Sequence, residues 1–234
     1  MRIWRPRLLL LFGLALSACS NGSQKPINSP PGPSSGPRDA DVVVGKVQFI
    51  QDEQAPGYAT AVVLVTNPNS GRWLPYSKYV FTAKDAAGAV LGSDENVVHL
   101  GPSASVGVVS PQISLGSTGA RLATVEFGLE PKPWRSADEY PDVALSVVSA
   151  VLVKGKNETR VTGQLTSDSN QTLSIRIHCL LLDTAGAFAG TGYGTVADVG
   201  GQAKSPFEAI VLHSKAGAKT AQCYAEALSN PGLY

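Results

Sequence analysis

Residues 85–92 read DAAGAVLG and residues 183–190 read DTAGAFAG, so one pattern of an aspartate and two glycines occurs twice, 98 residues apart. Each copy follows an apolar run. The aspartate can accept hydrogen bonds from the backbone beyond it, and the first glycine can adopt positive φ without a Cβ penalty. The sequence therefore predicts a β-hairpin turn in each copy. A further parallel, LGP at 100–102 and VGG at 199–201, lies at an offset of 99 and favours an internal repeat over chance similarity in an Ala- and Gly-rich chain.

Short runs rich in Val, Ile, Thr and Tyr surround these turns and predict β-strands. Gly, Pro, Asn and Asp interrupt them, and no stretch keeps a 3.6-residue apolar period for three turns. The richest runs are residues 59–66, 78–84, 122–129, 144–153, 172–182 and 221–228. We expect an all-β protein with two similar domains, residues 42–130 and 143–234. The Pro-rich and charged segment 131–142 is the expected linker.

The first residues have the features of a secretory signal. Three arginines precede an apolar run over residues 8–16, which is too short to span a bilayer, and residues 16–19 read LSAC. Cys19 resembles the lipobox cysteine of bacterial lipoproteins. The resemblance implies that residues 1–18 are removed and that Cys19 carries a diacylglycerol, whose two acyl chains hold a protein at a membrane surface more stably than one. The alternative is an ordinary signal peptide that is cleaved elsewhere and discarded with Cys19.

Residues 19–41 are rich in Pro, Ser, Gly and Asn, and they predict a disordered tether after the lipidated cysteine. Removal of residues 1–18 leaves 16 basic and 18 acidic residues, a formal charge of −2. Because no cluster of Lys and Arg remains, we expect no nucleic-acid partner. The expected location is the outer face of a bacterial membrane, in the cell envelope.

Two further cysteines lie in the second copy. Subtracting 98 from Cys179 and Cys223 gives Phe81 and Val125, which are both apolar, and strand alternation places the two cysteines on core-facing positions. In an exported protein, such a pair predicts a disulfide that closes a loop of about 45 residues and contributes about 4 kcal/mol in the chain-entropy model. Two buried free thiols are the alternative. A zinc site is not indicated, because no paired histidine accompanies the cysteines.

The two copies share a second pattern. In the first, VTNP at 65–68 precedes FTAKD at 81–85, and in the second CLLLD stands at 179–183. This order resembles the FxLYD-type domains of bacterial envelope proteins over about residues 42–130 and 143–228, with Phe81 and the two aspartates matching and Cys179 replacing the phenylalanine. The resemblance implies an immunoglobulin-like β-sandwich in each half, without enzymatic activity and without an assigned catalytic residue.

Three aromatic residues are candidates for binding. Trp134 and Tyr140 lie in the expected linker, and Trp73 lies in an expected loop. They either pack into the interface between the domains and fix its angle or form an exposed anchor for a partner.

The residues give little indication of catalysis or cofactor binding. His99, His178 and His213 have no second ligand at metal-site spacing, so no metal is expected; His178 is expected to face outward on its strand, and His99 to lie near a turn. No G-x-S-x-G motif is present, and the glycine-rich residues 190–194 lack the lysine and the helix of a phosphate-binding loop. We therefore predict no catalytic residue and no cofactor.

Taken together, these patterns favour a membrane-anchored envelope lipoprotein that acts as a non-catalytic protein-interaction or scaffolding module, with another envelope protein as partner. The alternative is a lipoprotein that binds a small ligand or a polysaccharide, in a pocket lined by aromatics such as Trp73, Trp134 or Tyr193. A hydrolase is less favoured, since it needs a perturbed His or carboxylate beside a hydroxyl in a cleft.

Overall fold

The computed structural model describes residues 39–53, 55–117, 119–140, 145–156, 158–168, 172–200 and 204–228. This part of the chain is all-β, as predicted, with one 3-10 helix, η1 (Ala137–Glu139). The signal segment, Cys19 and most of the expected tether lie outside it. Within the described residues, no helix has the length and apolarity to cross a bilayer. The strands are β1 (Val43–Val44), β2 (Gln48–Gln51), β3 (Tyr58–Thr66), β4 (Arg72–Lys84), β5 (Val90–Leu100), β6 (Ser105–Ser114), β7 (Thr124–Glu130), β8 (Arg135–Ser136), β9 (Leu145–Lys154), β10 (Thr159–Ser167), β11 (Leu173–Leu182), β12 (Phe188–Val199), β13 (Lys204–Val211) and β14 (Thr220–Ala227).

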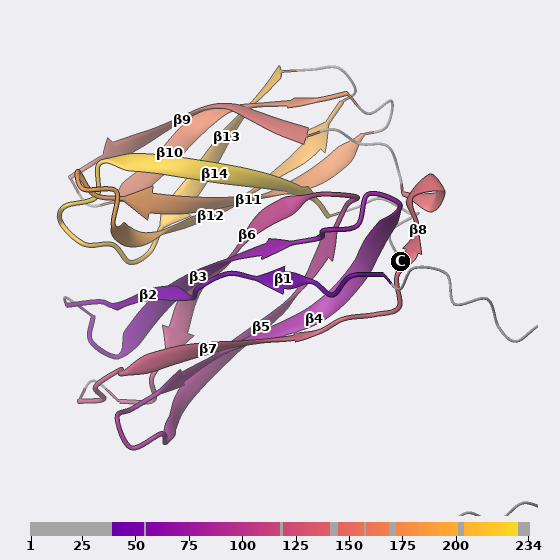
Figure 1. Cartoon of the computed structure of the whole chain (residues 1–234). Helices are drawn as coiled ribbons and strands as arrows, with labels where there is room; N and C mark the ends of the chain where they lie inside the picture. Colours follow the sequence, from indigo (N-terminus) through magenta and orange to yellow (C-terminus); the bar gives the residue numbers. More distant parts are fainter. Residues whose placement is uncertain are drawn as a thin grey trace, which may run out of the picture. The chain divides into compact units, whose positions relative to one another are not determined.

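The first half, β1 to β8, contains two sheets (Figure 1). In one, β3 pairs with β6 on one side and with β1 and β2 on the other. In the second, β4 lies between β5 and β7, and β8 pairs with the start of β4. Val63 of β3, Phe81 of β4 and Val108 of β6 share one buried apolar cluster, so the core lies between the two sheets.

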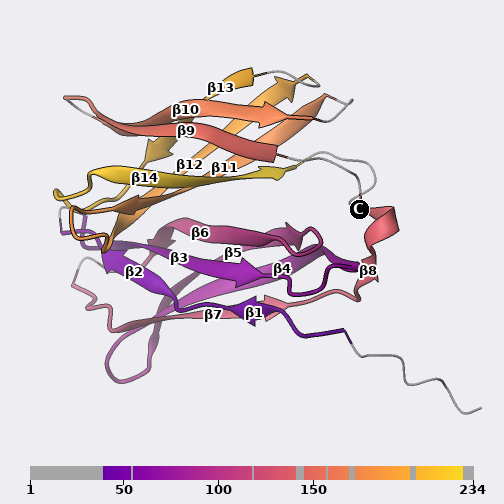
Figure 2. The same ribbon diagram turned by 45° about the horizontal axis from the view of Figure 1, so that its top comes forward.

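The second half forms one six-stranded sheet in the order β14-β11-β12-β13-β10-β9. Its end strands, β9 and β14, lie against each other, so the sheet nearly closes on itself (Figure 2). Between β12 and β13, Tyr193 and Ile210 are the one residue pair in register among the described residues. The sheet is therefore weakly joined at this place, which we call the second seam.

Both halves use the same pairing scheme. In the second half, β10 pairs with β13 and β9 as β3 pairs with β6 and β1/β2, and β11 pairs with β12 and β14 as β4 pairs with β5 and β7. Register agrees as well: Lys84 lies opposite Val90, and Leu182 lies opposite Phe188, both at an offset of 98. The repeat seen in the sequence is thus also a repeat of strand pairing.

The two predicted hairpin turns are present. Asp85 Oδ1 accepts hydrogen bonds from the backbone N–H groups of residues 87 and 89, both at 2.9 Å. Asp183 Oδ1 accepts the same two bonds from residues 185 and 187, at 2.8 and 2.9 Å. Gly88 and Gly186 have φ of +82° and +77°. The repeated Asp-x-x-Gly segment therefore closes each hairpin by the chemistry that its residues predict.

The second repeated glycine, Gly92, fills a place where no side chain fits. A Cβ there would overlap the carbonyl oxygen of Ser114. We expect Gly92→Ala to lower the free energy of unfolding by about 2–3 kcal/mol, because the backbone of β6 would have to move. Gly71→Ala is the control, since a Cβ at Gly71 would meet no atom within 4 Å. Urea unfolding of both variants tests this prediction, and equal midpoints would contradict it.

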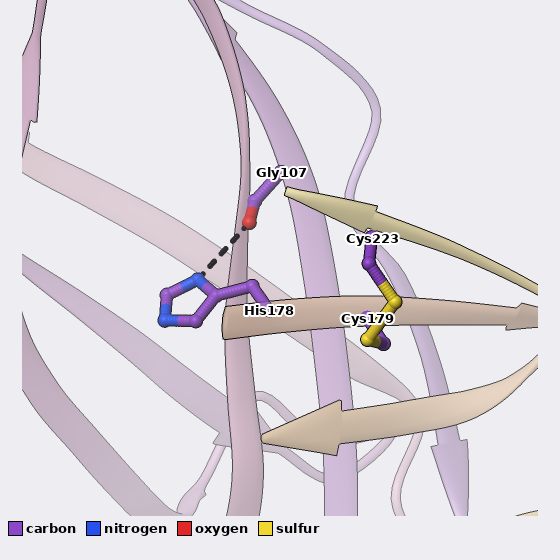
Figure 3. The surroundings of a disulfide bond; sticks show 4 residues. All are labelled: Gly107, His178, Cys179 and Cys223. Carbon is purple, nitrogen blue, oxygen red and sulfur yellow. Dashed lines mark hydrogen bonds between the residues drawn. A yellow bond between two sulfur atoms is a disulfide. The ribbon is translucent and has the colours of Figure 1, made fainter. Parts of the chain in front are cut away.

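The predicted disulfide between Cys179 and Cys223 is confirmed, and it joins directly opposed residues of β11 and β14 (Figure 3). In the first half, Phe81 lies opposite Phe127, with ring centroids 5.1 Å apart. Cys223 therefore corresponds to Phe127, at an offset of 96, and the sequence-based assignment of Val125 was two residues off. The disulfide stands where the first half has a cross-strand phenylalanine pair.

Candidate functional site

The two halves contact each other through the outer faces of two sheets. Strands β2, β3 and β6 of the first half lie against β11, β12 and β14 of the second. One apolar part of this contact is a separate buried cluster, made up of Ile50, Val62, Val109, Leu180 and Phe188. Since these side chains point away from the core of their own half, the interface is built on the outward faces of both sheets.

Charged side chains of the second half bond to free backbone groups of the first. Among the described residues, β5 and β6 lie side by side without a paired register, and we call this place the first seam. Arg176 Nη1 donates to the Val97 carbonyl at 3.2 Å, and the backbone N–H of His99 donates to Glu226 Oε1 at 3.2 Å. Arg176 and Glu226 lie opposite each other on β11 and β14, and both are buried. The pair thus provides hydrogen-bond partners for backbone groups on the edge of β5 that faces away from β4.

His178 bonds to the other strand of the first seam. Its Nδ1 lies 3.1 Å from the Gly107 carbonyl of β6, so Nδ1 carries the proton that is donated (Figure 3). The ring of Tyr224 covers the same glycine so closely that a Cβ at Gly107 would overlap it. The first seam is therefore closed on both strands by side chains of β11 and β14.

Each of the three histidines contacts the opposite half. His99 Nδ1 lies 3.0 Å from Glu226 Oε1, and His213 Nδ1 lies 2.6 Å from Asp52 Oδ2. His178 does point outward from its strand, but it is buried because the first half covers that face. His99 lies at the end of β5, two residues before the turn at residues 101–104, as expected. The histidines therefore belong to the interface between the halves.

Protonation of His178 and Glu226 in this interface should lower the free energy of unfolding. Burial, together with the Arg176 charge, holds the pKa of His178 below its usual value. Burial alone would raise the pKa of Glu226, but the hydrogen bond and charge of His99, with the charges of His178 and Arg176, bring it below its usual range. The His178 contribution is complete above its unfolded pKa of about 6.5 and is lost as pH falls through the lower folded value. The Glu226 contribution is lost only in more acidic solution, below about pH 4.5.

We expect the free energy of unfolding to fall from pH 7 to pH 5, with His178 contributing up to about 1.4 kcal/mol per pH unit. The variant His178→Gln keeps a donor for Gly107 and does not titrate, so its profile should be flatter in this window. Urea unfolding at a series of pH values tests this expectation. Parallel profiles for the two proteins would assign the loss to other groups.

The three candidate binding aromatics are buried or half-buried. Trp73 lies in β4 and not in a loop, and it is fully buried. The Tyr140 ring lies 5.4 Å from it, and the Arg135 guanidinium lies over it at 5.5 Å. Trp73 packs with the core cluster of the second half, and half-buried Trp134 packs with that of the first. Of the alternatives from the sequence, the positions of Trp73 and Tyr140 favour packing between the halves.

The second seam carries an open groove of about 1010 Å³. Thr195 and Ala197 of β12 lie on one side of it, and Pro206 and Glu208 of β13 lie on the other. Tyr193 also lines it, whereas Trp73 and Trp134 do not. All residues that line the groove belong to the second half. The second seam therefore differs from the first seam, which side chains of the opposite half close.

The groove extends over the exposed outer sheet surface of β9, β10 and β13, which we call the open face, and Val151 and Ile210 line the groove. Val151 is 58% exposed and Ile210 is 50% exposed, and Val153 is exposed next to them. Arg160 lies between, in ion pairs with Glu158 and Glu208. On the corresponding face of the first half, Thr60, Val62 and Val109 are buried against the second half, and Leu64 is 44% exposed. The open face differs because the second half has no neighbour over it among the described residues.

This arrangement can bind a protein surface. It offers apolar side chains, an ion-paired arginine and the backbone edges of a weakly joined seam, which are the features of an interaction site. No group of three or more His, Cys, Asp or Glu side chains among the described residues could hold a metal ion. Sequence reasoning missed the open face, although the run over residues 144–153 is apolar on both sides of its strand, as is typical of strands that are covered twice.

Comparison with known proteins gives no match, either to a family model or to a curated sequence.

Proposed function

We propose that this protein is a lipid-anchored component of the bacterial cell envelope that binds another protein through the open face, without catalysis. The observation that carries the proposal is the contrast between the halves. The first half buries Val62 and Val109 of this sheet surface against a neighbour, whereas the second half exposes the surface, with Val151, Val153 and Ile210 at its centre. Exposed apolar side chains grouped on one sheet face mark a site of protein contact.

Within this proposal, each half is an immunoglobulin-like sandwich of the FxLYD type. The shared strand pairing, the two Asp-x-x-Gly hairpins and the place of Phe81 on the strand before the first hairpin support this assignment. The nearly closed sheet of the second half is then a sandwich whose two layers touch at the second seam through Tyr193 and Ile210. Such a domain presents its faces and edges for binding and needs no active site.

The lipid anchor would hold this binding face at a membrane surface. We expect mass spectrometry of the membrane-extracted protein to find an acylated Cys19 as the N-terminal residue. An unmodified N-terminus upstream of Cys19 would contradict the anchor and leave the binding face to be tested separately.

Site-specific photo-crosslinking in intact cells tests the binding face. A photoreactive residue in place of Ile210 should give a discrete adduct, whereas the same residue in place of Val44, an exposed position on β1, should give none. The absence of any adduct at position 210 would overturn the proposed use of this face.

A further inference from the structure

The first half resembles the second at the register positions of the charged pair that closes the first seam, although Lys78 forms its ion pair with Glu95 of β5, at 2.7 Å. Lys78 of β4 lies opposite Glu130 of β7, as Arg176 of β11 lies opposite Glu226 of β14. Lys78 and Glu130 are exposed, and a cation and a carboxylate therefore stand at the same two register positions in both halves. The β4–β7 face of the first half thus repeats the chemistry of the β11–β14 face and is uncovered.

The second seam likewise repeats the backbone positions that this pair contacts. Thr195 stands where β5 has Val97, because Arg176 lies opposite Thr195 as Lys78 lies opposite Val97. Pro206 stands where β6 has Gly107, because Gln164 lies opposite Pro206 as Leu64 lies opposite Gly107. Among the described residues, no side chain bonds to the backbone of Thr195 or Pro206. The second seam is therefore a copy of the first without its closing side chains.

We propose that the second seam of one molecule receives the β4–β7 face of a second copy, head to tail. In this contact Lys78 donates to the Thr195 carbonyl, and Glu130 accepts from the backbone N–H at Ala197, as Arg176 and Glu226 do within the chain. Exposed Val90, which corresponds to Phe188, adds apolar area toward Ile210. The inference rests on the proposed function and names a second copy as the partner.

The interface between the two halves favours a second copy of the chain, and not an extended peptide, as the partner of the second seam. The first seam is filled by side chains that stand on a sheet face, not by an added strand. Both parts of such a contact are present in one chain, the receiving seam in the second half and the charged face in the first. Because the two parts lie on different surfaces, the contact is heterologous and leaves a free part at each end, so association continues beyond a dimer.

Sedimentation velocity of the purified protein over a range of concentrations tests this contact. We expect concentration-dependent association that Lys78→Glu and Ile210→Glu each weaken about tenfold or more, since each places a carboxylate against a buried carbonyl or an apolar contact. Lys78→Arg, which introduces the residue that the second half uses, should keep the association. Val44→Glu, at an exposed position on β1, is the control and should have no effect.

A mixture of the two weakened variants gives the sharpest result. Lys78→Glu keeps an intact seam, and Ile210→Glu keeps an intact charged face, so together they should form dimers and nothing larger. Unfolding midpoints of all variants verify that they fold.

Three results would overturn the inference. One is a wild-type protein that stays monomeric at about millimolar concentration. Another is association that Ile210→Glu abolishes and Lys78→Glu leaves intact, which would identify a symmetric dimer of open faces. The third is a crosslink at position 210 to a different protein, which would keep the proposed function and replace the partner.

Discussion

Glu226→Ala is expected to lower the free energy of unfolding by about 3–5 kcal/mol, because it removes one member of a buried charged pair and leaves the other without its partner. Glu226 is 4% exposed, lies 3.4 Å from Arg176 Nη1, and accepts the backbone N–H of His99. Loss of the carboxylate leaves the buried guanidinium of Arg176 without its counter-charge and the buried N–H group of His99 without its acceptor. Urea unfolding of the variant and the wild type measures the effect.

Glu130→Ala is the matched control, since Glu130 occupies the same register position on β7 and is exposed. Its effect should stay within about 0.5 kcal/mol. Glu226→Gln should fall between the two, because the amide still accepts from His99 but no longer carries the charge that faces Arg176. Equal effects for Glu226→Ala and Glu130→Ala would contradict the role of Glu226 in joining the halves.

Reduction of the Cys179–Cys223 disulfide is expected to lower the free energy of unfolding by about 2–4 kcal/mol. The bond closes a loop of 44 residues that includes β12 and β13. It therefore restricts the conformations that this loop can adopt in the unfolded chain. Urea unfolding with and without dithiothreitol measures the effect.

The double variant Cys179→Ala/Cys223→Ala is the control for the reductant. It should unfold at lower urea than the oxidised wild type, and dithiothreitol should leave its midpoint unchanged. A wild-type midpoint that does not respond to complete reduction would show that β11 and β14 are held by their pairing and packing alone.

Local chemistry explains which parts of the fold could be predicted from the sequence. The hairpins at Asp85 and Asp183 were predictable because the aspartate and the glycine act within five residues. The disulfide was predictable because strand alternation places Cys179 in the core. The counterpart of Cys223 was misplaced by two residues, at Val125 in place of Phe127, because the register of the last strand is fixed by its pairing with a distant strand.

Long-range packing explains what could not be predicted. Arg176, His178 and Glu226 alternate with apolar residues on their strands, and that pattern is equally typical of a face in solvent. Nothing in the sequence pattern tells that the first half covers this face. The Asn, Pro, Ser and Gly residues before Trp73 predict a loop, yet Trp73 is the second residue of a long strand and packs with the core of the second half. The open face could not be predicted for the same reason, because its exposure depends on which sheet faces the two halves pack against each other.

The most direct test of the account is the accessibility of the open face in the intact envelope. Val151→Cys on the open face and Val43→Cys on β1 have similar exposure, 58% and 55% for the native side chains, so a thiol reagent should label both at similar rates in the purified protein at low concentration. In intact cells, we predict that labelling at position 151 slows about tenfold or more while labelling at position 43 does not. Equal labelling of the two positions in cells would show that nothing covers the open face and would contradict its role as a binding site.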